Sequence, residues 1–197
     1  MEPKEDVTRE NRPSGELLEA EYNRVRYRNR FLRVMRNTLL SLLVVAAVAV
    51  LIVVLVLPVL KISGTSMEVT LMDGDIVVAT KTKNYKPGDV VAFYYNNSIL
   101  IKRVIGSAGD WVDMDETGNV YVNGQKLDEP YVTDKALGEC NITFPYQVPD
   151  DRYFVMGDHR ATSIDSRTRE VGCIGEDMVV GRLFFRVWPL SGFGLIH

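Results

Sequence analysis

The feature that most constrains this chain is an apolar run of 23 residues, Thr38 to Leu60, which contains no charged side chain. At a rise of about 1.5 Å per residue, the run is just long enough to cross a hydrocarbon core of roughly 30 Å. A buried helix of a soluble protein would rarely lack ionisable groups over this length. A cleavable signal peptide has a shorter apolar region, about 7–15 residues. The run therefore predicts a retained transmembrane anchor over residues 38–60.

The flanks of this run predict its orientation. Only Lys61 follows it closely, whereas six arginines precede it: Arg24, Arg26, Arg28, Arg30, Arg33 and Arg36. Arginine-rich flanks stay on the cytoplasmic side. We therefore expect residues 1–37 inside and residues 61–197 outside a cell membrane crossed once. The polar stretch from Met1 to about Gly15 is predicted to be disordered, and the charged stretch from Glu16 to Arg36 to be helical.

Composition excludes some functions and leaves one question open. A formal net charge of −3 does not favour a nucleic-acid partner, which would need a basic face. Two cysteines and two histidines offer little for a metal site, so neither metal nor cofactor is expected. Cys140 and Cys173 both fall in the exterior part, where a disulfide is chemically permitted but not required.

After Lys61 the sequence changes to short runs rich in Val, Ile and aromatic residues, separated by Gly, Asp, Asn and Pro. Such runs favour β-strands. Asn123–Gly124 is a strong hairpin signal, because a type I′ turn needs positive φ at both central residues. A mainly β domain of about 135 residues is expected. Its predicted strands are Ile76–Thr80, Val90–Tyr95, Ile99–Ile105, Trp111–Val112, Val120–Val122, Tyr153–Met156 and Val179–Val187.

Two residues suggest nucleophilic chemistry. Ser66 lies among small residues a few positions after the apolar run, and a serine hydroxyl becomes a nucleophile when a nearby base removes its proton. A lysine can be that base if burial lowers its pKa. Strand alternation places Lys102 on one face with Leu100 and Val104, so its own neighbours are apolar. A turn serine and an edge-strand lysine are the ordinary alternatives.

A polar loop, Gly157 to Arg167, follows the predicted strand Tyr153–Met156. Loops carried on a β scaffold often hold active-site residues, although a solvated loop is the simpler interpretation.

Four segments in order resemble the type I signal peptidases, the bacterial Ser–Lys enzymes. Together they cover about Ser63 to Gly181. They are Ser63-Gly-Thr-Ser-Met67 with Thr70-Leu71, Gly88-Asp-Val-Val-Ala92, Lys102-Arg-Val-Ile-Gly106 with Gly109-Asp110, and Gly157-Asp-His-Arg160 through Ser163, Asp165, Ser166 and Arg167.

The resemblance implies a signal-peptidase-like β-barrel or sandwich domain and a role for each matching residue. Ser66 would be the nucleophile, with its backbone N–H binding the oxyanion, and Lys102 the general base. Ser163 would orient the Lys102 amine through a hydrogen bond. The charged loop residues would have structural roles: Asp158, Arg160, Asp165 and Arg167. Substrates would be secretory preproteins with small residues before the cut, met at the lipid bilayer close to the export translocon.

The chain departs from the family pattern at Val69 and His159, and at position 64 it follows the Gram-positive-like members, which lack a side-chain donor to the oxyanion. Gly64 stands where some members have a serine that donates to the oxyanion, Val69 replaces a usual proline, and His159 replaces a usual asparagine. His159 raises the alternative of a Ser–His mechanism, but the base position is already filled by Lys102.

Three other function classes are alternatives. A sortase-like transpeptidase would use Cys173, His159 and Arg182, although no local motif supports it. A membrane-anchored β domain that only binds a partner would not need Ser66. A soluble self-cleaving repressor is disfavoured by the membrane span and by the lack of a DNA-binding segment.

Overall fold

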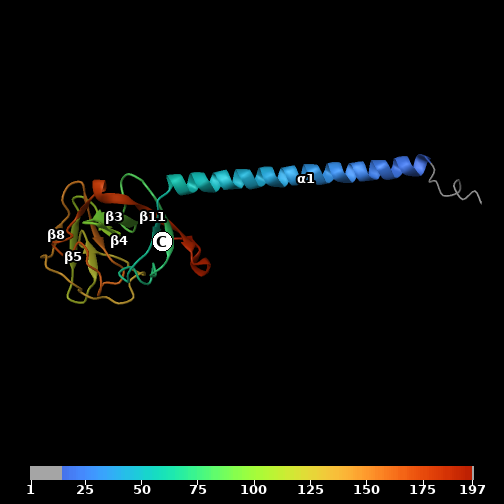
Figure 1. Ribbon diagram of the computed structural model, residues 1–197. Coiled ribbons are helices and arrows are strands. Elements are labelled where there is room, and N and C mark those ends of the chain that lie inside the picture. The colour runs from blue at the N-terminus through green and yellow to red at the C-terminus, as the bar shows by residue number, and fades with distance from the viewer. Residues whose placement is uncertain (1–14, 197) are drawn as a thin grey trace, which may run out of the picture. The chain divides into compact units, whose positions relative to one another are not determined.

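A single long helix, α1 (Gly15–Val56), begins the part of the chain that this computed structural model describes, residues 15–196 (Figure 1). The stretch predicted to be disordered lies outside this range. The predicted charged helix from Glu16 to Arg36 and the apolar run as far as Val56 form one continuous helix. Within α1, Leu18–Ile52 is long and apolar enough to cross a membrane by length and composition. Its side chains from Leu39 to Ile52 are exposed, as expected of a lipid-facing helix.

The helix ends before the apolar run does. α1 stops at Val56, and Val59–Lys61 form strand β1. Pro58 explains this end, because proline lacks a backbone N–H and disfavours the helical conformation in the residue before it. β1 pairs antiparallel with β2 (Ile76–Thr80), so Leu60 belongs to the β domain rather than to the helix. The described residues divide into two compact units at Val53 and Val54.

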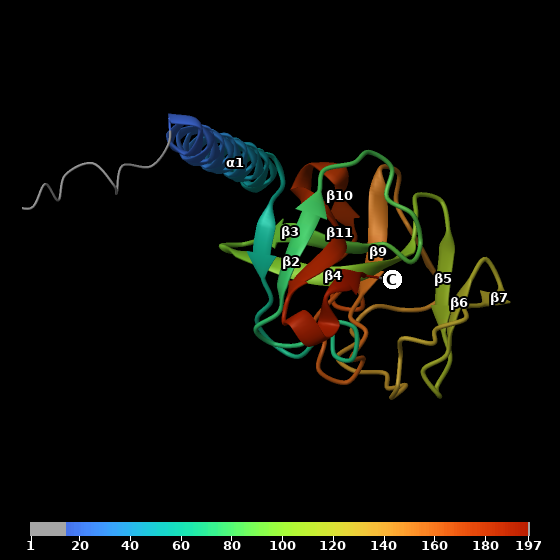
Figure 2. The same ribbon diagram turned by 90° about the vertical axis from the view of Figure 1, so that its right-hand side faces the viewer.

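The second unit is built from two antiparallel sheets (Figures 1 and 2). The larger has the order β1-β2-β11-β3-β4-β9-β10, with β12 paired to β11, and the smaller has the order β7-β6-β5-β8. The remaining strands are β3 (Val90–Tyr95), β4 (Ser98–Gly106), β5 (Trp111–Met114), β6 (Val120–Val122), β7 (Gln125–Lys126), β8 (Tyr146–Gln147), β9 (Arg152–Met156), β10 (Ile174–Gly175), β11 (Val179–Trp188) and β12 (Gly194–Leu195). Two short 3-10 helices complete the elements, Glu176–Met178 and Leu190–Gly192. The mainly β expectation is confirmed.

Two apolar clusters flank the central strands of the larger sheet. One contains Met67 and Leu71 from the segment before β2, packed with Val90 and Ala92 of β3. The other lies on the opposite side of β3 and contains Val91 and Phe93 of that strand. They pack with residues of neighbouring strands, among them Val104 of β4 and Val155 of β9. β4 therefore runs through the middle of the domain, between β3 and β9.

Candidate active site

The side chains of Ser66 and Lys102 meet within the β domain. Lys102 Nζ donates a hydrogen bond to Ser66 Oγ over 2.7 Å. Ser66 lies in the turns between β1 and β2. Its neighbour Met67 is buried in the apolar cluster beside β3, and this anchor fixes the backbone of Ser66. The structure thus brings together the two residues that the sequence singled out, 36 positions apart.

Lys102 is almost fully buried, with a relative exposure of 2%. It sits in β4 and pairs with Val91 of β3, so regular strand geometry directs its side chain. Burial lowers the pKa of Lys102 from 10.5 to about 8, because the charged ammonium loses its water. The Asp165 and Asp158 carboxylates oppose this shift, and the Arg167 guanidinium reinforces it. At pH 8 about half of the Lys102 side chains are therefore neutral amines that can accept a proton.

Ser163 lies against the same site but donates to a different partner from the one expected. Its hydroxyl donates to Asp165 Oδ2 over 2.6 Å, and a direct bond to Lys102 stays a prediction. Gly157 lets the chain pass close to both Ser163 and the Ser66 backbone. A Cβ atom there would lie 2.2 Å from Ser163 Oγ and 2.6 Å from the Ser66 carbonyl oxygen. Only glycine allows the loop to pass between these two serines.

The loop after Gly157 is fixed by buried ion pairs. Arg167 binds Asp165 with two hydrogen bonds of 2.8 Å, and both side chains are fully buried. Arg167 also donates to the carbonyls of Leu137 and Arg160, while the Gly157 N–H donates to Asp165. Each charge is therefore paired and hydrogen-bonded, as burial requires.

Asp158 and Arg160 form buried ion pairs whose partners, Arg103 and Glu129, were not predicted from the sequence. Asp158 accepts two hydrogen bonds from Arg103, which follows Lys102 in β4 and also lies 3.9 Å from the ring centre of Tyr131. Arg160 is paired with buried Glu129. No local signal marked Glu129, because its partner is 31 residues away.

Two cavities adjoin the Ser66–Lys102 pair. One of about 160 Å³ is lined by Ile62, Met67 and Ile101 beside the pair, and a more open one of about 420 Å³ is lined by Tyr95 and Ile164. Both are partly apolar and have Ser66 and Lys102 in their lining, so they offer room for small side chains of a peptide beside the pair.

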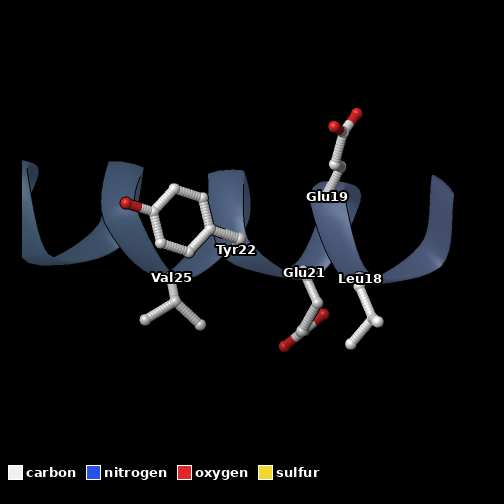
Figure 3. Close-up of a pocket in the computed structure, with 5 residues that line it drawn as sticks. All are labelled: Leu18, Glu19, Glu21, Tyr22 and Val25. Atoms are coloured by element: carbon white, nitrogen blue, oxygen red, sulfur yellow. The ribbon is translucent and has the colours of Figure 1, made fainter. Parts of the chain in front are cut away.

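The hollow drawn in Figure 3 has a different character. Leu18, Tyr22 and Val25 surround it on α1 together with two glutamates, and Figure 3 shows these side chains spread along one exposed helix. It belongs to the helical unit and contains no nucleophile.

The backbone beside Ser66 offers a hydrogen-bond donor. Within residues 15–196, the Ser66 N–H donates to no other group, whereas its carbonyl accepts the His159 N–H over 3.1 Å. A donor beside a nucleophile is what an oxyanion formed on a substrate carbonyl requires.

In the described part of the chain, no hydrogen bond or ion pair joins the residues of the sortase-like alternative. Cys173 is buried, and burial raises the pKa of its thiol to about 11, so it is a poor nucleophile. Arg182 pairs with Asp89, and His159 lies beside Thr65. Cys173 and Cys140 are both free thiols, which answers the open question of a disulfide. Among residues 15–196 no group of three His, Cys, Asp or Glu side chains is placed to hold a metal.

Known proteins resemble this chain along most of its length. Residues 35–188 match the family described as "Signal peptidase, peptidase S26". Signal peptidase IB of Staphylococcus aureus (strain COL) is 40% identical over 152 residues, which are 67% of this chain and 78% of the relative. Signal peptidase I T of Bacillus subtilis (strain 168) is 38% identical over 144 residues, 66% of this chain and 73% of the relative. A solved signal peptidase I from Enterococcus faecalis V583 is 29% identical with a TM-score of 0.44, covering 51% of this chain and 97% of that one.

Proposed function

This chain belongs to the signal peptidase family, peptidase S26, and from this premise we propose that it is a membrane-bound serine endopeptidase with a Ser66–Lys102 dyad. Its reaction is the removal of N-terminal signal peptides from exported preproteins. The observation that carries the proposal is the 2.7 Å hydrogen bond between Lys102 Nζ and Ser66 Oγ at a buried position.

The proposed reaction begins with Lys102 as a neutral amine. Lys102 Nζ takes the hydroxyl proton as Ser66 Oγ attacks the scissile carbonyl carbon. The carbonyl oxygen becomes an oxyanion that accepts a hydrogen bond from the Ser66 N–H. When the C–N bond breaks, the Lys102 ammonium returns its proton to the leaving amine, and the acyl group stays on Ser66. A water molecule then gives a proton to Lys102 as its oxygen attacks the ester carbon. The bond between that carbon and Ser66 Oγ breaks, Lys102 returns the proton to Ser66 Oγ, and the signal peptide leaves with a carboxyl terminus.

The remaining predicted site residues support this dyad in the proposal. Ser163 orients the Lys102 amine by accepting a hydrogen bond from it, while the Ser163 hydroxyl is held by Asp165, which has a structural role. Asp158, Arg160 and Arg167 hold the loop through their buried ion pairs, so their roles are structural.

A membrane location gives the enzyme its substrates. We propose that residues 1–37 are cytoplasmic, that the anchor lies within residues 38–60, and that residues 61–197 form the catalytic domain on the outer face of the cell membrane. Ser66 follows the end of α1 by only ten residues, which limits its reach from the bilayer to roughly 35 Å. A signal peptide in the same bilayer, near the export translocon, presents its cleavage site within that distance and at high effective concentration.

The decisive experiment uses the full-length protein in detergent with a secretory precursor. Ser66→Ala and Lys102→Ala should each abolish cleavage, while Ser191→Ala, at an exposed serine outside the site, should cleave at the unchanged rate. Circular dichroism of each variant verifies its fold. Cleavage by a folded Ser66→Ala protein would contradict the proposal and favour a domain that only binds a partner.

A further inference from the structure

His159 contacts the backbone on both sides of the nucleophile. Its main-chain N–H donates to the Ser66 carbonyl over 3.1 Å, and its ring Nδ1 lies 3.3 Å from the Thr65 carbonyl oxygen. The side chain is about one-third exposed, so the fold does not depend on burying it. Among the residues at the site, His159 thus holds two successive carbonyls around Ser66.

The Thr65 carbonyl matters because of the group at the other end of its peptide unit. Thr65 C=O and Ser66 N–H belong to the same planar peptide, so fixing the oxygen also fixes the direction of the N–H. A hydrogen bond accepted by the carbonyl polarises the unit and strengthens its N–H as a donor. That N–H is the proposed oxyanion donor. The carbonyl also accepts the Glu68 N–H over 3.1 Å, and its second lone pair remains for His159.

We infer that His159 is a positioning residue, which aims the Ser66 N–H at the oxyanion by donating its Nδ1–H to the Thr65 carbonyl. This inference rests on the proposed Ser66–Lys102 function. The donor is present in the imidazolium and in one neutral tautomer. Glu68 is the other polar group near the ring, with its carboxylate 3.7 Å from Nδ1, which is too long for a hydrogen bond.

The test replaces His159 by two side chains of similar shape. Asparagine places an N–H donor the same number of bonds from the backbone as Nδ1, whereas leucine has no donor. Removing a direct oxyanion donor costs about 10²–10³ in kcat, and an indirect one, with the Glu68 N–H still in place, should cost about tenfold. We therefore expect His159→Leu to lower kcat about tenfold on a signal-peptide substrate with little change in KM. His159→Asn should keep kcat within about threefold of the wild type.

Three controls make the result decisive. Glu68→Gln should leave kcat unchanged, because the contact that matters is to Thr65. Thermal unfolding of each variant separates a loss of kcat from a loss of fold. If the leucine variant is unstable, His159→Asp serves instead, since it keeps a polar side chain but has no N–H at neutral pH.

Wild-type kcat in the donor-free variant, or equal losses in the asparagine and donor-free variants, would overturn the inference. A fall in kcat for Glu68→Gln as large as that for His159→Leu would also overturn it, because the nearby Glu68 carboxylate would then be the cause. Ser66→Ala is assayed in parallel. If it is inactive while His159→Leu is normal, only the role of His159 fails; if it is active, the proposed function itself fails.

Discussion

Strand β4 and the loop from Gly157 to Thr168 both border Ser66, and they are stabilised in opposite ways. β4 is a regular strand, held by ladder hydrogen bonds to β3 and β9. Its one buried amine, Lys102, has lost much of its affinity for a proton. The loop has no ladder of its own and is held by fully buried arginine–carboxylate pairs, such as Arg167 with Asp165.

The difference shows how one small domain can bury charges for two purposes. Where a cation is buried without a full-strength ion pair, as at Lys102, desolvation lowers its pKa and makes it a base. Where each cation has a bidentate carboxylate, as in the loop, the charge is retained and fixes the backbone. Removing a charge should therefore have different consequences in the two segments.

The largest effect is expected from Lys102→Met, which removes the base but not the strand. Cleavage should fall by at least about 10³-fold, since the residual rate relies on binding and the oxyanion donor alone. Stability should not fall, because an apolar side chain replaces a costly buried amine. A peptide cleavage assay and thermal unfolding measure the two effects. Lys126→Met, at an exposed position in β7, is the matched control. Retained activity would remove Lys102 from the mechanism.

Asp165→Asn should damage fold and activity together. It leaves the Arg167 charge buried without its carboxylate, which typically costs about 3–5 kcal/mol. Urea unfolding of the β domain measures this loss, and the cleavage assay measures the accompanying loss of activity. Asp128→Asn, at an exposed aspartate, should change neither. An Asp165→Asn protein as stable as the wild type would show that the loop does not depend on its ion pairs.

The pH dependence should report the low pKa of Lys102. Because the neutral amine is the active form, kcat/KM should rise with pH through about 8 and fall about tenfold per unit below it.

Stability should follow the same group with a definite sign. Between pH 8 and 10.5 the unfolded chain keeps the Lys102 proton that the folded chain has released, so this residue makes stability rise with pH. The free energy of unfolding is measured at several pH values for the wild type and for Lys102→Met. Other titrating groups are the same in both proteins, so the difference gives the contribution of Lys102. A pH profile of kcat/KM with its midpoint near 10.5, instead of about 8, would show that Lys102 is not desolvated.

The smallest effect is expected at the cysteines. Alkylation should label exposed Cys140 and leave cleavage unchanged, because no thiol takes part in the proposed reaction. Mass spectrometry counts the labelled thiols while the cleavage assay runs on the same sample. Inactivation that tracks labelling of Cys173 would instead support the sortase-like alternative.

Regular elements were predictable from the sequence, because their signals are local. Ile76–Thr80, Val90–Tyr95 and Val120–Val122 are strands with the expected bounds, and Asn123 and Gly124 both have positive φ. Lys102 was found because strand alternation gave it apolar neighbours and because it stands at the lysine position of the family motif. β1 was missed, since its residues continue the apolar run and only Pro58 marks the change.

Contacts between distant segments were not predictable in the same way. Nothing near Glu129 indicates that it will neutralise Arg160, and nothing near Thr65 indicates that the ring of His159 will contact its carbonyl. These partners are set by how the loops pack on the sheet, which no periodicity encodes.

The burial of Met67 has a consequence for how this protein would fail under heat. The Met67 side chain lies in the same apolar cluster as Leu71, Val90 and Ala92. Met67 is the next residue in the chain after Ser66, which carries the reactive hydroxyl. We therefore expect Ser66 to keep its position for as long as this cluster stays packed. Heat inactivation and melting of the β domain should share one midpoint temperature. A substitution that stabilises this cluster should raise the inactivation temperature by as many degrees as it raises the melting temperature.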